Sequence, residues 1–200
     1  IFRSYIQYFF IQNFSTNYSL DYMSKVNKFN SEFYVNFENK FRGSTASIID
    51  RLGCYDQLLE TILENTVNPN ILDIACGRGE WLFKCKNLGL KCKGIDQNNE
   101  MVSMSSSLSL DVVKSDALNY LRSIPDNSYS MVTSFHFIEH VTSAYLLEMI
   151  FEIYRILKND GLLLLETPSI DNLMISSRVF YLDPTHITRI NPDAIQFTLN

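Results

Sequence analysis

The sequence lacks the long apolar runs, the cysteine pairs and the excess of basic residues that mark several common classes of protein. No apolar run approaches the roughly 20 residues that a helix needs to cross a bilayer, the longest being Tyr8–Ile11 and Leu162–Leu165. The four cysteines, at positions 54, 76, 85 and 92, include no C-x-x-C pair, so we expect reduced thiols in a cytoplasmic protein. The net charge of −5 argues against binding of bulk DNA or RNA, because nucleic-acid-binding proteins concentrate Lys and Arg to neutralise phosphates.

The length and composition fit one globular domain with a sizeable core. The 200 residues are 46% hydrophobic and 20% charged, which is ordinary for a globular protein. Residues 1–40 are rich in Asn, Ser, Tyr and Phe without sustained periodicity. We therefore predict an irregular or helical N-terminal extension over 1–40 and a single domain over 41–200. Because the chain begins with Ile1 and stops at Asn200 in an expected helix, we expect a fragment that is cut at both ends.

The stretch with the clearest ligand-binding pattern is Ile71–Leu82, which reads ILDIACGRGEWL. A short apolar run breaks into two closely spaced glycines before apolar spacing resumes, which predicts a strand, a tight turn and the start of a helix. Gly77 and Gly79 let the backbone turn sharply and let a ligand approach without meeting a Cβ atom. The N-terminus of the following helix offers unpaired N–H groups. We therefore predict a small-molecule site at this glycine turn.

The residue at position 82 decides between two kinds of nucleotide site. Dinucleotide-binding folds use G-x-G-x-x-G, and Leu82 stands where the third glycine belongs, which argues against a NAD-dependent enzyme. The stretch instead resembles motif I of class I S-adenosylmethionine-dependent methyltransferases, a hydrophobic residue followed by L-D-x-G-C-G-x-G. Ala75 replaces the first glycine of that motif, a mild change unless the residue needs a positive φ angle.

Expected strands and helices alternate along the chain. Apolar residues at spacings of three and four predict an amphipathic helix over Ile48–Leu63. Strands are expected from residue 71 to the glycine turn and at 91–96, 112–113, 129–135 and 162–166, the last one fully buried; helices are expected after the turn, at 98–107, around Tyr120 and at 145–157. This alternation predicts an α/β fold: a three-layer, doubly wound, Rossmann-like methyltransferase fold with a mostly parallel sheet. The closing strands of a complete class I methyltransferase are expected to be missing before Asn200.

Carboxylates end three successive expected strands, at Asp73, Asp96 and Asp116. Asp96 lies 19 residues after Gly77, where a nucleotide-binding fold needs a carboxylate to accept two hydrogen bonds from ribose hydroxyls. Asp116 is equally well interpreted as a helix N-cap. The resemblance to class I methyltransferases runs from Leu72 to Glu166 and implies that S-adenosylmethionine contacts Asp73, Ala75, Cys76, Gly77, Gly79, Asp96, Gln97, Asp116, Ala117 and Phe135.

Two of the three histidines flank a glutamate in the segment 135–141, FHFIEHV. The segment resembles the Glu-x-x-Glu-His element of ubiquinone-biosynthesis O-methyltransferases and the two-Glu, two-His magnesium site of small-RNA 2'-O-methyltransferases, with His136 in place of the first Glu. That resemblance implies His136, Glu139, His140 and His186 as ligands of a divalent metal ion. Three imidazoles and one carboxylate suit zinc, manganese or iron better than magnesium, which prefers oxygen.

The same segment allows two interpretations without a metal. A hydroxyl loses its proton more readily to a positioned histidine or beside a cation, so His140 is the first candidate for a catalytic base and His136 the second, with Glu139 beside them. Alternatively, Glu139 and His140 cap the following helix and His136 is a core side chain. Arg42 is a candidate to clamp the carboxylate of the cofactor or a substrate phosphate through its guanidinium fork; the alternative is a solvated arginine at a helix entry.

A longer series of motifs from about Asn36 to Asn200 looks like bacterial methyltransferases found with O-antigen and other surface-glycan machinery: FRGS, CGRGEWL, FHxxEH, ETPS and YLDPTH. That resemblance implies methylation of a sugar hydroxyl, with glycan-assembly enzymes as partners. Tyr181 and Asp183 are candidates to line the acceptor pocket, or loop residues. The alternatives are an O-methyltransferase for a small phenolic or quinone-like acceptor, and a non-catalytic methyltransferase-like module that binds the cofactor or a partner protein.

Overall fold

The computed structural model describes residues 35–199. Residues 1–34 of the predicted N-terminal extension lie outside the described residues, and residues 35–41 are helical. The boundary predicted after residue 40 therefore falls inside a helical segment, and the site described below includes residues from both sides of it.

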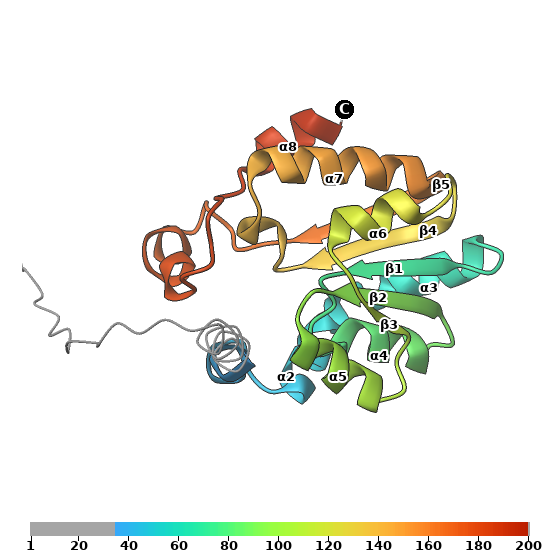
Figure 1. Cartoon of the computed structure of the whole chain (residues 1–200), viewed down its shortest axis with the longest axis horizontal. Coiled ribbons are helices and arrows are strands. Elements are labelled where there is room, and N and C mark those ends of the chain that lie inside the picture. The colour runs from blue at the N-terminus through green and yellow to red at the C-terminus, as the bar shows by residue number, and fades with distance from the viewer. Residues whose placement is uncertain (1–34, 200) are drawn as a thin grey trace, which may run out of the picture.

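A five-stranded parallel sheet forms the centre of the described chain (Figure 1). Its strands are β1 (Asn70–Ile74), β2 (Lys91–Asp96), β3 (Val112–Lys114), β4 (Tyr129–Phe135) and β5 (Leu157–Glu166). The strand order is β3-β2-β1-β4-β5, and every neighbouring pair is parallel. The winding direction reverses between β1 and β4, which is where ligands bind in folds of this kind. The predicted doubly wound α/β fold is confirmed.

Helices cover both faces of the sheet and make three layers (Figure 1). They are α2 (Thr45–Arg51), α3 (Asp56–Asn65), α4 (Glu80–Asn87), α5 (Asn99–Ser107), α6 (Ala117–Ser123), α7 (Ser143–Ile156) and α8 (Pro192–Leu199), with short turns η1 (Leu52–Tyr55), η2 (Ile138–His140), η3 (Ile175–Val179) and η4 (Phe180–Leu182). Leu72 and Ile74 of β1 pack in one core with α6 and α7. Ile71 packs in the other core with α2, α3 and α4. Successive residues of a buried strand thus supply opposite layers, as strand geometry requires.

Two elements differ from the sequence predictions. The helix expected over Ile48–Leu63 is two helices joined by η1, where Asp56 N–H bonds back to the carbonyl of Gly53 in a tighter turn; glycine is a weak helix former, so a break here costs little. Strand β5 starts at Leu157 and includes an irregularity opposite Tyr129. It is half-buried rather than fully buried, because within the described residues it pairs with β4 alone.

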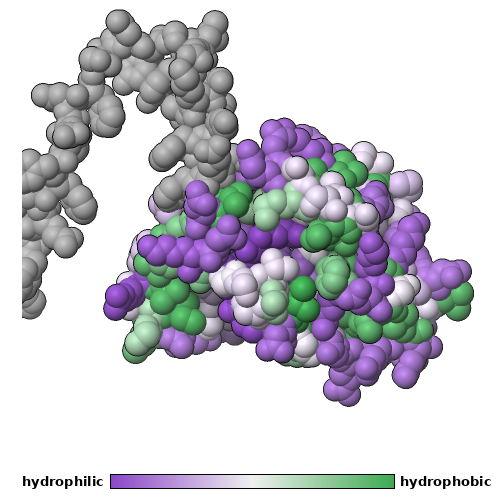
Figure 2. Space-filling model, turned by 90° about the horizontal axis from the view of Figure 1, so that it is seen from below, coloured by the Kyte–Doolittle hydropathy of each residue, from purple (hydrophilic) through white to green (hydrophobic). Residues whose placement is uncertain are grey.

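The surface gives no sign of a membrane-spanning element in the described part of the chain. No helix within residues 35–199 is both long enough and apolar enough to cross a bilayer. On the side of α4 and α5, hydrophilic and hydrophobic residues are interspersed rather than gathered in one apolar area (Figure 2).

Candidate functional site

The glycine turn between β1 and α4 adopts three left-handed backbone conformations in five residues. Ala75, Gly77 and Gly79 have φ angles of 55°, 53° and 83°. The turn is closed by the Gly79 N–H, which donates to the Cys76 carbonyl at 2.9 Å. Position 75 therefore does need a positive φ, and alanine pays a strain of roughly 1–2 kcal/mol that glycine avoids. The condition under which alanine is not a mild replacement for glycine is therefore met at this position.

Asp96 at the end of β2 holds this turn in place. Its Oδ2 accepts a hydrogen bond from the Gly77 N–H at 2.9 Å, and its Oδ1 accepts one from the Asn98 N–H at 2.8 Å. Burial raises the pKa of Asp96, and the backbone N–H groups of Asn98, Gly77 and Gln97 counteract that rise. Each carboxylate oxygen has a second lone pair. Asp96 can therefore accept two further hydrogen bonds from a ligand without releasing the turn.

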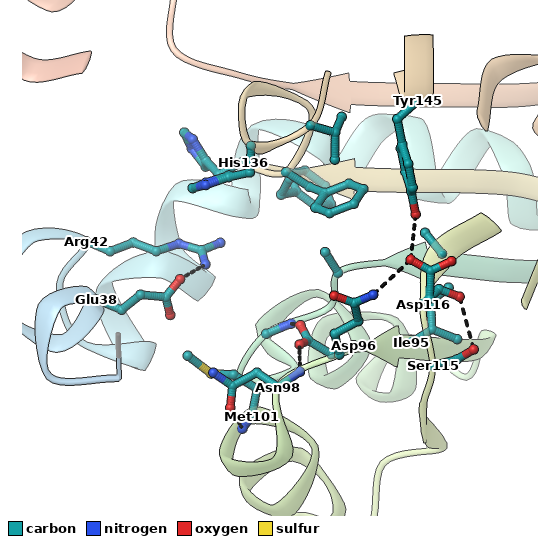
Figure 3. A pocket seen from close by; sticks show the side chains of 18 residues that line it. Glu38, Arg42, Ile95, Asp96, Asn98, Met101, Ser115, Asp116, His136 and Tyr145 are labelled. Carbon is teal, nitrogen blue, oxygen red and sulfur yellow. Dashed lines mark hydrogen bonds and ion pairs between the residues drawn. The ribbon is translucent and has the colours of Figure 1, made fainter. Parts of the chain in front are cut away.

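A cavity of about 450 Å³ opens at the carboxyl ends of β1, β2, β3 and β4 (Figure 3). Eight of the predicted cofactor residues line it: Arg42, Ala75, Gly77, Asp96, Gln97, Asp116, Ala117 and Phe135. A Cβ atom added at Gly77 would meet no atom closer than the Arg42 guanidinium at 3.7 Å. The backbone of the turn is thus open to a ligand on this side.

Three predicted cofactor residues lie elsewhere. Asp73 and Cys76 line a second cavity, described below, and Gly79 lines neither. Asp73 is buried and accepts a hydrogen bond from Thr133 Oγ1 at 2.7 Å, and burial raises its pKa to about 7. A Cβ at Gly79 would lie 2.6 Å from Leu110 Cδ1, so this glycine allows close packing of the turn against the segment after α5.

Asp116 caps α6 and also lines the first cavity. Its Oδ1 accepts from the Asn119 N–H at 3.0 Å and so caps α6. Its Oδ2 accepts from Tyr145 Oη at 2.9 Å and from Gln97 Nε2 at 2.8 Å, at the rim of the cavity (Figure 3). Burial, together with Asp116, raises the pKa of Tyr145 to about 12. These bonds tie β2, β3 and α7 together around one end of the cavity.

A second cavity of about 490 Å³ adjoins the first. The two cavities share Glu38, Arg42, Ala75, Phe135, His136 and His140. The second is walled on one side by apolar residues, among them Phe37, Phe41, Leu52, Trp81, Ile175, Val179 and Leu182, and its polar residues include Arg51, Glu166, Asp183 and His186. Both predicted catalytic histidines therefore lie at the junction of the two cavities.

His136 is held between two carboxylates. Its Nε2 lies 3.1 Å from Glu166 Oε1 and its Nδ1 lies 3.4 Å from Glu139 Oε1. Burial lowers the pKa of His136, but the contacts with Glu139 and Glu166 outweigh it and raise this pKa to about 9. Tyr55 Oη donates to Glu166 Oε2 at 2.6 Å and fixes that carboxylate. The raised pKa favours the imidazolium form of His136 at neutral pH, which is the wrong form for a base.

His140 is oriented by a chain of hydrogen bonds. Its Nδ1 lies 2.8 Å from Thr185 Oγ1, whose hydroxyl donates to Asp183 Oδ1 at 2.5 Å. Because that hydroxyl proton goes to Asp183, Thr185 accepts from Nδ1–H of His140, and the imidazole lone pair then lies on Nε2. Burial lowers the pKa of His140 and favours the neutral ring. His140 therefore meets the electronic requirement of a base that His136 does not.

Three of the four predicted metal ligands come together. One ligand atom each from Glu139, His140 and His186 lies within 4.8 Å of the others, whereas His136 is outside that group. Glu139 is fully buried; its Oε2 accepts from Thr167, and its Oε1 faces the His136 Nδ1 at 3.4 Å. His186 Nδ1 lies 2.7 Å from the Phe180 carbonyl and Nε2 faces Glu139 Oε1 at 3.9 Å.

Of the remaining candidates, Arg42 and Asp183 line a cavity and Tyr181 does not. Arg42 follows the helical residues 35–41 and pairs with Glu38 at 3.1 Å, over the cavity junction rather than out in solvent (Figure 3). Asp183 is buried and lines the second cavity. Tyr181 is 61% exposed and lines neither cavity; the Arg189 guanidinium stacks over its ring at 4.7 Å.

Sequence reasoning missed several residues of the first cavity. Glu38, Asn98, Met101 and Tyr145 all line it. Asn98 carried a signal, since it lies two residues after Asp96 and caps α5 through its side chain. The others carried none, because their distance in sequence from the turn hides their position in space.

Comparison with known proteins agrees with this geometry. The sequence profile of a family described as "Methyltransferase domain" matches residues 72–165. Among solved structures, the chain is similar to an S-adenosylmethionine-dependent methyltransferase from Archaeoglobus fulgidus, with 36% identity and a TM-score of 0.72 over 84% of this chain and 72% of that one. No curated protein matches the chain.

Two more distant structures show the fold alone. The PH0226 protein from Pyrococcus horikoshii is 21% identical, with a TM-score of 0.61 over 82% of this chain and 75% of that one. Phosphoethanolamine N-methyltransferase 2 from Haemonchus contortus, solved in complex with S-adenosyl-L-methionine, is 17% identical, with a TM-score of 0.55 over 82% of this chain and 42% of that one.

Proposed function

The chain belongs to the S-adenosylmethionine-dependent methyltransferases, and on that premise we propose that it methylates a hydroxyl group of a small acceptor. The observation that carries this proposal is the junction of two cavities at His140, one of them built on the glycine turn and Asp96. A donor held in the first cavity and an acceptor held in the second would meet beside a neutral imidazole.

We propose the following roles in the first cavity. Asp96 accepts hydrogen bonds from the ribose hydroxyls through its two remaining lone pairs, and Gln97 and Asp116 lie on the adenine side. Arg42 reaches the carboxylate of the methionyl part. The 450 Å³ cavity, the open backbone at Gly77 and the spare acceptor capacity of Asp96 all fit this cofactor.

The chemistry needs alignment and one proton acceptor. When bound, S-adenosylmethionine supplies a methyl group on a positively charged sulfonium. As the acceptor oxygen forms its bond to the methyl carbon, the carbon–sulfur bond breaks, and alignment alone supplies much of the acceleration. His140 Nε2 takes the hydroxyl proton, and the Asp183–Thr185 hydrogen bonds hold the ring in the required tautomer.

The acceptor class rests on a resemblance and on the lining of the second cavity. We propose a sugar hydroxyl in surface-glycan synthesis, in the cytoplasm and alongside glycan-assembly enzymes, because the motif series from FRGS to YLDPTH resembles such methyltransferases. The apolar wall around Phe41, Trp81 and Leu182 favours a second candidate, a small phenolic or quinone-like acceptor, whose ring would bury more apolar surface there.

A divalent ion at Glu139, His140 and His186 is a separate proposal. Metal-binding histidines usually donate their second ring N–H to an outer partner, and here Thr185 and Phe180 provide such partners. The buried Glu139 Oε1 fits a cation ligand. A bound ion would lower the pKa of an adjacent hydroxyl, and it would replace the base role of His140. Elemental analysis decides between the two: about one ion per chain that Glu139→Gln loses supports the metal, and a substoichiometric content contradicts it.

The proposed function is tested by binding and transfer measured separately. Isothermal titration calorimetry should show binding of S-adenosylmethionine, and transfer of a labelled methyl group is then measured to sugar nucleotides and to phenols. We expect His140→Ala to keep cofactor affinity and to lose transfer. A full transfer rate in His140→Ala would refute the base assignment. Cofactor binding without transfer to any acceptor would favour a non-catalytic module.

A further inference from the structure

The second residue of the Gly77-Arg78-Gly79 turn is a buried arginine that lines neither cavity. Its side chain is only 4% exposed, and arginine is rarely buried unless it is paired. The turn itself does not require a long charged side chain at this position, since a small exposed residue would also fit it. The burial of Arg78 therefore calls for a set of partners that keeps this charge in place.

The partners of Arg78 lie mostly on the N-terminal segment, here residues 38–43. Its Nη1 donates to Asn39 Oδ1 at 2.8 Å and its Nη2 donates to the Gly43 carbonyl at 3.1 Å. Its Nε lies 2.8 Å from Glu80 Oε1 and 3.8 Å from Glu38 Oε2. The Arg78 side chain thus hydrogen-bonds to the N-terminal segment near both of its ends, at Asn39 and at Gly43.

Arg42 belongs to this N-terminal segment. It lies between Asn39 and Gly43 in sequence, its Nη1 pairs with Glu38 Oε1 at 3.1 Å, and it lines both cavities. In Figure 3 Glu38 and Arg42 approach the cavity from the N-terminal segment, opposite the strand ends that carry Asp96. Within the described residues, the chain leads from this segment to the sheet through α2, η1 and α3, and the Arg51 Nη2 also donates to the Arg42 carbonyl at 2.7 Å.

We propose that Arg78 is a positioning residue: it fastens the N-terminal segment to the glycine turn so that Arg42 stands over the methionyl end of the cofactor site. The inference rests on the proposed contact between Arg42 and the cofactor carboxylate. In this arrangement the backbone and the side chain of the turn have different tasks. The backbone of the turn faces the ligand, and the Arg78 side chain holds the segment that closes over the ligand's amino-acid group.

This role makes a prediction that general damage to the fold does not. Arg42 recognises a carboxylate, so displacing it weakens only ligands that carry one. S-adenosylhomocysteine has the amino-acid carboxylate, and 5'-methylthioadenosine has the same adenosine and sulfur without it. Arg78→Met should therefore weaken S-adenosylhomocysteine binding about tenfold or more, the worth of a hydrogen-bonded charge pair, and change methylthioadenosine binding less than about twofold.

The experiment is calorimetric titration of both ligands into the wild type and four variants. Asn39→Ala removes an exposed partner of Arg78 without touching the turn, and it should show the same selective loss on a smaller scale even if Arg78→Met folds poorly. Arg42→Ala should show the largest selective loss. Arg122→Met, which removes an exposed arginine paired with Glu148 on the far side of the sheet, should change neither affinity.

The outcomes separate the inference from the proposal beneath it. If Arg42→Ala loses S-adenosylhomocysteine selectively but Arg78→Met and Asn39→Ala do not, the positioning role is overturned and the Arg42 contact stands. If Arg42→Ala binds both ligands like the wild type, the Arg42 contact itself is wrong, and the positioning role falls with it. Equal losses for both ligands in Arg78→Met and Asn39→Ala would show a structural role in the turn and would also overturn the inference.

Discussion

Replacing Asp96 tests the cofactor site at the point where its geometry is most fully defined. The carboxylate already accepts one backbone N–H on each oxygen, from Gly77 and from Asn98, and the proposal assigns its two other lone pairs to ribose hydroxyls. Asp96→Ala removes all four acceptor positions. Asp96→Asn keeps the size and one oxygen, but it turns an NH2 group toward one of the backbone donors and removes the charge.

The expected loss follows from the number of hydrogen bonds. A hydrogen bond to a charged group contributes about 1.5–3 kcal/mol, so loss of two weakens the complex by about 3–6 kcal/mol. At roughly 1.4 kcal/mol per factor of ten, Asp96→Ala should raise the Kd for S-adenosylhomocysteine by about 10²–10⁴-fold. Asp96→Asn, which keeps one acceptor, should raise it by about 10–100-fold on the same scale.

Calorimetric titration measures these affinities, and urea unfolding confirms that each variant is folded. Asp111→Asn is the matched control, because Asp111 is an exposed carboxylate paired with Lys93, beside the same strand as Asp96; it should leave the Kd within about twofold. A folded Asp96→Ala protein with a Kd within threefold of the wild type would refute the ribose assignment.

Two further predictions concern stability. Gly94→Ala should lower the free energy of unfolding by about 1–3 kcal/mol, because the new Cβ would lie 2.6 Å from both Cys76 Sγ and Leu82 Cδ1. Gly89→Ala has open space around its Cβ and should lower it only by the left-handed strain of about 1 kcal/mol. Equal losses for the two variants in urea unfolding would contradict this. Burial raises the pKa of Asp73 to about 7, so the folded state binds this proton more tightly than the unfolded state, and stability falls as pH rises above about 4 and levels off above about 7. In Asp73→Asn, the free energy of unfolding should fall by about 2–3 kcal/mol less between pH 5 and pH 8 than in the wild type. Identical pH dependence of stability in the two proteins would refute this.

The parts of the site that the sequence predicted are local in the chain. Gly77 and the carboxylate at Asp96 follow from a strand, a turn and the next strand in order, and a doubly wound sheet brings consecutive strand ends to one edge. The fold class was predictable for the same reason, since helix and strand periodicities alternate over most of the domain. The backbone strain at Ala75 was visible only as a question, because a φ angle depends on the turn that surrounds it.

The parts that the sequence did not predict depend on long-range contacts. Tyr145 reaches Asp116 across 29 residues, and Arg78 reaches Asn39 across 39. No periodicity connects such pairs, since their meeting depends on how α7 and the N-terminal segment pack. Asp183 was predicted as a candidate for the acceptor pocket, but the hydrogen bonds by which Thr185 and Asp183 orient His140, from a loop about 45 residues further along the chain, were not.

The junction of the cavities shows why two histidines four residues apart are not interchangeable. His136 lies between the carboxylates of Glu139 and Glu166, whose contacts raise its pKa. His140 has its Nδ1–H directed to Thr185, and burial lowers its pKa. Where neighbours drive the pKa values of two titratable groups apart, the groups take different roles. On the proposed function, the lowered pKa suits His140 to accept a proton from the acceptor hydroxyl, and the raised pKa of His136 does not.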